Sequence, residues 1–290
     1  MRPDLGLLVV ADGVSGSGAG GLAAALAVRE VERFFEAARR RGASSRMTAK
    51  VARARLVRAF AAARRRIRAA ARRHRRRAGM TTTMVAMVVV RDRVVMAHLG
   101  DSRVYRLRGL YIDHRRGRVY GREQEIERLT LDHNGLEDEA WRARHSEHEL
   151  ASRADLQLIT RVVGERAMVR VNTRLEKVEP GDTFVLCTDG LHGVLLDWLI
   201  EAPLRYVSFL RDVMVQARDM AVPDAQCTWL VEKVKQRKAP DNVTVVVARI
   251  KKGRGRFRTE RGIGHVVHAS TYRAPWVPLP EEDEDEDEDE

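Results

Sequence analysis

The sequence has 290 residues, of which 44% are apolar, so it can build a hydrophobic core. Only two residues are cysteines, Cys187 and Cys227, which excludes a disulfide framework and a cysteine-based zinc site. Residues 281–290 are all acidic, and without them the net charge of +12 becomes +22, which allows nucleic acid or acidic protein as a partner. No apolar run reaches the ~18 residues of a membrane helix and no signal peptide is readable, so the sequence predicts a cytoplasmic protein with no membrane partner.

The first half of the chain changes from helical to strand-like patterning. The apolar run at 7–11 predicts a buried strand, and after a glycine-rich loop the helical spacing continues to about Gly42. A second helix, capped by Ser44, Ser45 or Thr48, has an apolar stripe of Val51, Val57, Phe60, Ile67 and Ala71. From Met80 the pattern predicts strands over 84–90, 93–99, 103–107 and 129–131.

The second half predicts more strands, several helices and an irregular end. Alternation over 169–178 places Val169, Val171, Thr173 and Leu175 on one face, and the turn at 180–182 leads to a strand over 183–187. Helices are predicted over 191–200, 204–220 and 224–238, and a last strand over 243–250. We expect a folded domain over 1–250, a linker over 251–280 and an acidic disordered tail over 281–290, with an α+β fold class because helices and strands form separate blocks.

Four aspartates stand at strand ends, each beside a glycine or asparagine: Asp12, Asp101, Asp189 and Asp241. Converging carboxylates repel one another unless a cation lies among them, and hard oxygen ligands favour Mg²⁺ or Mn²⁺. Two such ions can clamp a phosphoryl group and activate a water. Turn aspartates are also common for local hydrogen-bonding reasons, and spacing alone does not show that the four meet.

Seven short motifs contain these aspartates or lie between them in the sequence. They are VADGVSG at 10–16, GMTTT at 79–83, AHLGDSR at 97–103, LTLDHN at 129–134, TRVVG at 160–164, LCTDGL at 186–191 after GD at 181–182, and DNVTV at 241–245. The ordered set resembles the metal-dependent serine/threonine protein phosphatases of the 2C type, in their bacterial form.

The resemblance implies a sandwich of two antiparallel β-sheets flanked by helices, and a phosphatase that hydrolyses phosphoserine and phosphothreonine on proteins by a metal-activated water. It implies two ions, Mn²⁺ or Mg²⁺. Asp12 and the Gly13 carbonyl would bind the first, and Asp12, Asp189 and Asp241 the second. A third ion, often present in bacterial members, would use Asp101 and Asp189. A phosphorylated protein, and a serine/threonine kinase that supplies it, are the implied partners; no substrate-binding residue or oligomeric state is assigned.

The resemblance is incomplete at the start of the sequence. Only eleven residues precede Asp12, so the family's strand with a phosphate-holding Arg and its Asn-Glu-Asp-like segment have no counterpart. Either the sequence is truncated at its start or it has lost part of the site, and the main alternative function is that of a catalytically impaired relative that binds phosphoproteins.

Two further patterns invite other interpretations. Gly16, Gly18 and Gly21 outline a dinucleotide fingerprint, but the expected second strand ending in an acid is absent. Residues 37–91 carry 18 Lys or Arg and no acid, with twelve arginines between Arg53 and Arg77. The basic segment has three interpretations: a nucleic-acid-binding helix, the solvated face of an amphipathic helix, or a face onto which the acidic tail folds. The absence of interleaved aromatic residues favours the solvated face.

Overall fold

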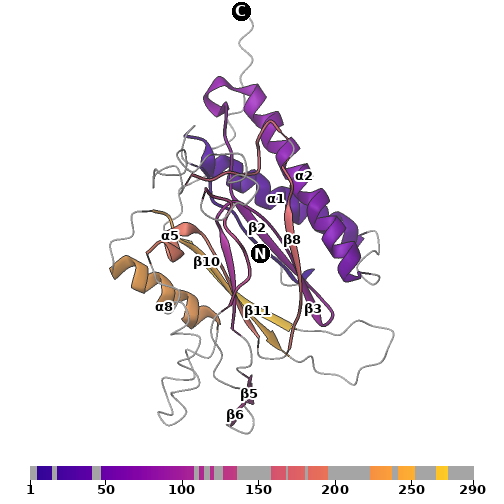
Figure 1. Ribbon diagram of the computed structural model, residues 1–290, viewed down its shortest axis with the longest axis vertical. Coiled ribbons are helices and arrows are strands. Elements are labelled where there is room, and N and C mark those ends of the chain that lie inside the picture. Colours follow the sequence, from indigo (N-terminus) through magenta and orange to yellow (C-terminus); the bar gives the residue numbers. More distant parts are fainter. Residues whose placement is uncertain are drawn as a thin grey trace, which may run out of the picture.

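The computed structural model describes residues 5–14, 18–40, 47–107, 111–113, 118–120, 127–135, 158–167, 169–179, 182–194, 223–236, 241–251 and 266–273. Two antiparallel sheets pack face to face, and helices cover their outer faces (Figure 1). This confirms the predicted α+β class and the sandwich of two antiparallel sheets.

The first sheet has the strand order β1-β2-β3-β8, and the second β11-β10-β9-β4-β7. The first contains β1 (Leu7–Val10), β2 (Met84–Val90), β3 (Arg93–Leu99) and β8 (Asn172–Lys177). The second contains β4 (Arg103–Leu107), β7 (Glu127–Arg128), β9 (Thr183–Cys187), β10 (Thr244–Lys251) and β11 (Val266–Arg273). A separate hairpin pairs β5 (Tyr111–Asp113) with β6 (Arg118–Tyr120).

Helices α1 (Gly20–Arg40) and α2 (Ala49–Arg73) cover the first sheet, and α2 leads into the short 3-10 turn η2 (Arg75–Arg77). The short α5 (Asp189–His192) and α8 (Pro223–Gln236) lie on the second sheet. Within the described ranges, no helix has both the length and the apolar character to cross a membrane.

The strands of the first sheet are apolar on both faces because each face packs on something. Along β2, Met84, Ala86 and Val88 join the core under α1 and α2, whereas Val85 and Met87 join the core between the two sheets. Successive side chains of a strand point to opposite faces, so a strand between two apolar layers needs a continuous apolar run. The predicted strands over 84–90, 93–99, 103–107 and 183–187 are therefore confirmed residue for residue.

The apolar stripe predicted for the second helix is partly wrong. Thr48 is the cap, accepting a hydrogen bond from Val51 N at 3.3 Å, but Val51 and Val57 are 40% and 38% exposed. The buried side follows a 4-3-4 spacing through Leu56, Phe60, Ala63 and Ile67. Val57 lies about 100° round the helix from Leu56 and so faces away from the sheet.

Two other expectations change. The strand expected at 129–131 is instead β7 at 127–128, just before it. The predicted linker over 251–280 contains β11, which pairs with β10 along its whole length. Its valines, threonine and tyrosine favour strands, a signal that the irregular pattern obscured. The expected helix at 204–220, most of that at 191–200 and the acidic residues 281–290 lie outside the described residues.

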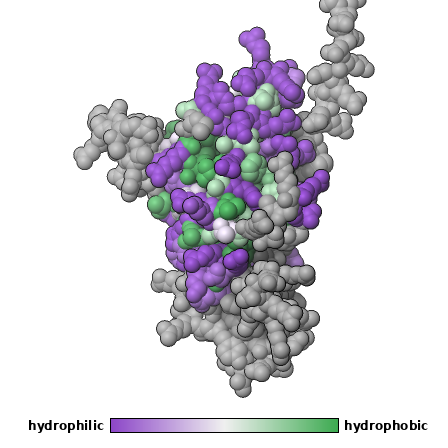
Figure 2. Space-filling model, turned by 90° about the vertical axis from the view of Figure 1, so that its right-hand side faces the viewer, coloured by the Kyte–Doolittle hydropathy of each residue, from purple (hydrophilic) through white to green (hydrophobic). Residues whose placement is uncertain are grey.

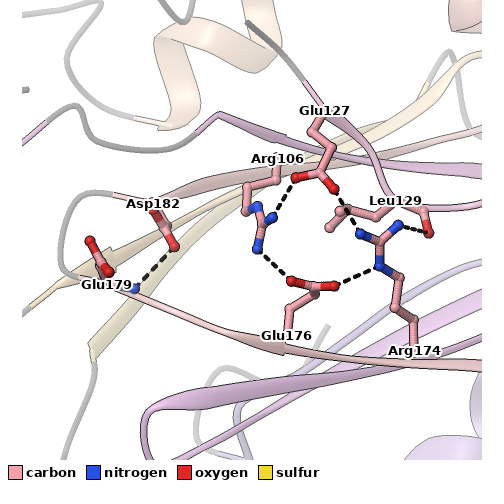
Figure 3. Close-up of polar contacts among 7 residues, drawn as sticks. All are labelled: Arg106, Glu127, Leu129, Arg174, Glu176, Glu179 and Asp182. Atoms are coloured by element: carbon pink, nitrogen blue, oxygen red, sulfur yellow. Dashed lines mark hydrogen bonds and ion pairs between the residues drawn. The ribbon is translucent and has the colours of Figure 1, made fainter. Parts of the chain in front are cut away.

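Two arginines and two glutamates form a closed ring of ion pairs where the edges of the two sheets meet (Figure 3). Arg106 on β4 bonds both Glu127 on β7 and Glu176 on β8, the latter at 3.0 Å. Arg174 on β8 bonds the same two glutamates at 2.7 Å each. Arg106 is only 5% exposed. The ring therefore ties the edge strands β7 and β8 of opposite sheets together.

We expect Arg106→Met to reduce the free energy of unfolding at pH 7 by about 1–3 kcal/mol, because each of the two carboxylates then loses one of its two arginine partners. Although burial acts in the opposite direction, hydrogen bonds from Arg174 and Arg106 lower the pKa of Glu176. The contribution is thus present above the ordinary carboxyl pKa and is lost as the pH falls below it.

Urea unfolding of both proteins at pH 7 and at about pH 3.5 measures this difference. Lys235→Met is the control, because Lys235 pairs with Glu232 on the exposed surface of α8, where such pairs contribute about 0.3–0.5 kcal/mol. An equal effect of the two substitutions at pH 7 would contradict a special role for the ring.

Candidate active site

Asp12 comes two residues after β1, and its backbone is held by the residues that lead into β2. Its carbonyl oxygen accepts hydrogen bonds from Thr83 N at 2.8 Å and from Thr82 Oγ1 at 2.6 Å. Its own N–H donates to Thr83 Oγ1 at 3.2 Å, and that hydroxyl lies 2.8 Å from Ser102 Oγ. The Asp12 carboxyl group therefore leaves a backbone that is fixed at three points.

Gly13 occupies a position where no side chain fits. A Cβ there would lie 2.1 Å from the carbonyl carbon of Gly20, at the start of α1. Gly13 also forms an isolated bridge with Thr82. The close approach places the first turn of α1 directly against the loop that carries Asp12.

Asp101 lies in the connection between β3 of the first sheet and β4 of the second. The preceding Gly100 has φ +99°, and a Cβ there would lie 2.5 Å from the Thr83 Cβ, so both conformation and space require glycine. The Asp101 carbonyl accepts a hydrogen bond from His192 Nε2 at 3.1 Å. Since a carbonyl can only accept, Nε2 carries the proton.

Asp189 and Asp241 lie on two loops that touch each other. Asp189 opens α5 after β9, and Asp241 precedes β10, the strand paired with β9. A Cβ on Gly190 would lie 2.2 Å from Asn242 O. Thr188 Oγ1 donates to Asn242 O at 3.4 Å and accepts from the N–H of Thr244 at 3.1 Å. The absence of a side chain at residue 190 thus lets the two aspartate-bearing loops meet.

The four carboxyl groups interact with one another through their charges. Burial raises the pKa of Asp12 to about 8, helped by the charge of Asp189 and a hydrogen bond with it, and then by the charges of Asp241 and Asp101. Burial and the charges of Asp189 and Asp132 raise the pKa of Asp101 to about 7. The aspartates from the four strand ends therefore come together at one end of the sandwich.

Two of the carboxylates also accept hydrogen bonds within their own loops. Asp189 Oδ1 accepts from Gly190 N at 2.8 Å and Asp241 Oδ1 accepts from Asn242 N at 2.6 Å. Across the ranges that the structure covers, no three His, Cys, Asp or Glu side chains form a ready-made metal-binding group. The donor set itself consists of carboxylate oxygens, and burial together with mutual repulsion raises two of their pKa values. Such a set suits a divalent cation such as Mn²⁺ or Mg²⁺.

An arginine–carboxylate pair lies beside this site. Arg103 Nε and Nη2 donate to the carboxylate of Asp132, the shortest contact being 2.8 Å, and Nη1 donates to Tyr105 Oη at 3.0 Å. Asp132 is 3% exposed. Although burial lowers the pKa of Arg103, hydrogen bonding to Asp132 raises it, so the guanidinium stays charged next to Asp101.

The residues that connect the aspartates were not assigned roles from the sequence. Thr82, Thr83, Ser102, Thr188 and Asn242 occur inside the quoted motifs, and His192 lies in none of them. Small polar residues next to a strand-end aspartate are the signal that could have identified the first five. His98 and His133 stack with ring centroids 4.7 Å apart and hydrogen-bond to backbone atoms.

Comparisons with known proteins agree on one family. The family model for protein phosphatase 2C matches residues 2–232. The serine/threonine phosphatase stp of Listeria monocytogenes is 25% identical over 239 residues, which cover 81% of this chain and 87% of that protein.

Solved structures show the same arrangement. PppA of Pseudomonas aeruginosa has a TM-score of 0.59 and 28% identity, over 86% of this chain and 88% of that one. The PstP/Ppp phosphatase of Mycobacterium tuberculosis has a TM-score of 0.61 and 26% identity, over 84% and 88%. A structure of the PstP catalytic domain with two manganese ions, at 24% identity and a TM-score of 0.60, has the same fold over 84% of this chain and 87% of that one.

Proposed function

This chain belongs to the protein phosphatase 2C family, and from that premise we propose that it hydrolyses phosphoserine and phosphothreonine on proteins with the help of divalent cations. The observation that carries the proposal is the convergence of Asp12, Asp101, Asp189 and Asp241, where burial, followed by repulsion from the other three, raises the pKa of Asp12 to about 8. Such a cluster is costly in a metal-free protein and becomes favourable when cations neutralise it.

The assignment of individual ligands is part of this proposal. Asp12, with Gly13 beside it, would hold one ion, and Asp12, Asp189 and Asp241 a second. Asp101 and Asp189 would hold a third. The two manganese ions in the PstP catalytic domain support the identity of the metal. When bound, the ions would polarise the phosphoryl group and lower the pKa of the attacking water.

Other residues of the chain would hold the proposed metal ligands in position. Thr82 and Thr83 hold the Asp12 backbone, and contact between Gly190 and Asn242 sets the separation of the other two loops. Ligand groups must be held within about 0.5 Å of their productive positions. Burial lowers the pKa of His192, so the ring that holds the Asp101 carbonyl is neutral and adds no positive charge to the cation site.

The direct test is phosphate release by the full chain after removal of metal by a chelator. We expect activity on a phosphothreonine peptide to return with added Mn²⁺ or Mg²⁺, and calorimetry to detect Mn²⁺ binding. Mn²⁺ binding without hydrolysis of any phosphoserine or phosphothreonine peptide would favour the alternative, a relative that only binds phosphoproteins. Failure to bind Mn²⁺ would overturn the metal assignment itself.

A further inference from the structure

The end of α2 and the turn η2 carry an exposed group of arginines, which we call the arginine cluster: Arg72, Arg73, Arg75 and Arg76. Figure 2 looks onto the face on which α2 lies and shows hydrophilic side chains over much of it. Within the part of the chain that the structure describes, none of the four makes an ion pair or hydrogen bond through its side chain. By contrast, Arg33 and Arg39 on α1 each pair with a glutamate one turn away. The cluster is thus uncompensated positive charge.

The cluster lies at the same end of the sandwich as the four aspartates. The chain runs from Arg76 to Thr82 in six residues, a path of at most about 21 Å when fully extended. Thr82 bridges Gly13 and donates its hydroxyl proton to the Asp12 carbonyl. The intervening residues therefore hold the arginine cluster near the loop that carries Asp12.

The chain also leaves its last described strand at this end. Arg273, the final residue of β11, pairs with Thr244, which follows Asp241 by three residues. The acidic segment, residues 281–290, comes after Arg273 and consists only of Asp and Glu. It lies outside the described residues, but its reach follows from its length. From Arg273, the residues up to 281 and 290 can extend about 28 Å and about 60 Å.

That reach is sufficient for the distance between the second sheet and the helical layer that carries the arginine cluster. Neighbouring layers of a sandwich lie about 10 Å apart, so the second sheet and the α1–α2 layer are separated by about 20 Å. The two groups also match in charge, with ten carboxylates against a surface of uncompensated guanidinium groups, which accept carboxylates in a fork geometry.

We propose that the arginine cluster is the docking site of residues 281–290 of the same chain. Single exposed ion pairs are weak, but a tether gives the segment an effective concentration in the millimolar range, and several pairs act together. The docked segment occupies the basic surface that other polyanions would otherwise bind. The interaction is independent of the proposed catalytic reaction, since none of the four arginines is a metal ligand.

Electron spin distance measurements between labels at Ala78→Cys and Glu290→Cys test the proposal in the full chain. Ala78 is exposed and adjoins the cluster, whereas both native cysteines are buried. We expect a population of short distances at about 0.01 M salt that is lost at about 1 M, where screening shortens the Debye length from about 30 Å to about 3 Å. Dilution with unlabelled chain should leave this population unchanged; its loss on dilution would overturn docking within one chain.

Two sets of substitutions make the result specific. Changing the cluster to glutamine (Arg72, Arg73, Arg75 and Arg76) should remove the short distances. A control set with the same charge loss, taken from exposed arginines elsewhere, should retain them: Arg29, Arg40, Arg91 and Arg93. Should the cluster variant fail to fold, a chain whose acids at 281–289 are changed to their amides serves instead and should lose the same population. Short distances that survive either change, or that disappear equally in the control set, would overturn the proposal.

Discussion

Asp189→Asn is expected to lower Mn²⁺-dependent hydrolysis of a phosphothreonine peptide by at least about tenfold, because it removes a charge from the proposed cation site and weakens activation of water. Asp12→Asn and Asp241→Asn should have similar effects. Asp101→Asn should leave folding and the two-ion centre closer to normal, since it would affect only the third ion. Steady-state phosphate release as a function of Mn²⁺ concentration measures the loss for each variant.

Two controls separate loss of function from loss of structure. Asp92→Asn changes an aspartate in the β2–β3 turn, at the far end of the strands that lead to the site, and should retain activity. In the metal-free state, Asp12→Asn should unfold at the same temperature as the unchanged chain or at a higher one, because it relieves repulsion among the clustered carboxylates. Turnover by Asp189→Asn equal to that of the unchanged chain would rule out the proposed ligand set.

Gly190→Ala should be as damaging, although it changes no charge. The added methyl group would meet Asn242 O at 2.2 Å, which forces the loops that carry Asp189 and Asp241 apart. Overpacking of this kind costs about 1–3 kcal/mol of stability. Displacement of catalytic groups by about 1 Å can cost about a hundredfold in rate, so we expect a loss of activity of that order.

Gly21→Ala is the matched control, because a Cβ at Gly21 in α1 has no atom within 4 Å. Alanine is the better helix former by about 1 kcal/mol, so this variant should be at least as stable as the unchanged chain and equally active. Gly190→Ala should therefore lower both the unfolding temperature and the rate of phosphate release, whereas Gly21→Ala should lower neither. If Gly190→Ala keeps full activity, the contact with Asn242 does not set the spacing of the loops.

The strands that are buried on both faces could be predicted from the sequence. Runs such as 84–90 and 183–187 are apolar at every position, so predicting their type and limits did not require deciding which alternate residues face the core. The stripe of α2 was harder to predict because alanines fill much of its buried side, and the valines at 51 and 57 appeared to continue it. A face made of small residues lies close to its neighbour without a strong hydrophobic signal.

The aspartates of the candidate site could be predicted from the sequence, but the hydrogen bonds that join their loops could not. Each aspartate followed or preceded a strand beside glycine or asparagine, a local pattern that is visible in one dimension. The bonds that join the loops, such as Thr83 to Ser102 and His192 to the Asp101 carbonyl, link residues 19 and 91 positions apart. Nothing in the local sequence specifies such partners, because they follow from how the two sheets are stacked.

The placement of the aspartates on both sheets has a mechanical consequence. Asp12 extends from the first sheet, Asp189 and Asp241 adjoin strands of the second, and Asp101 lies in the connection between them. The candidate site therefore spans both sheets. The distances between its aspartates depend on the apolar layer between the sheets, in which Leu8, Val85 and Phe184 are fully buried. A small slip of one sheet over the other would change the separations of the four aspartates although no residue of the candidate site had been altered, so the packing of the interior determines the geometry of that site.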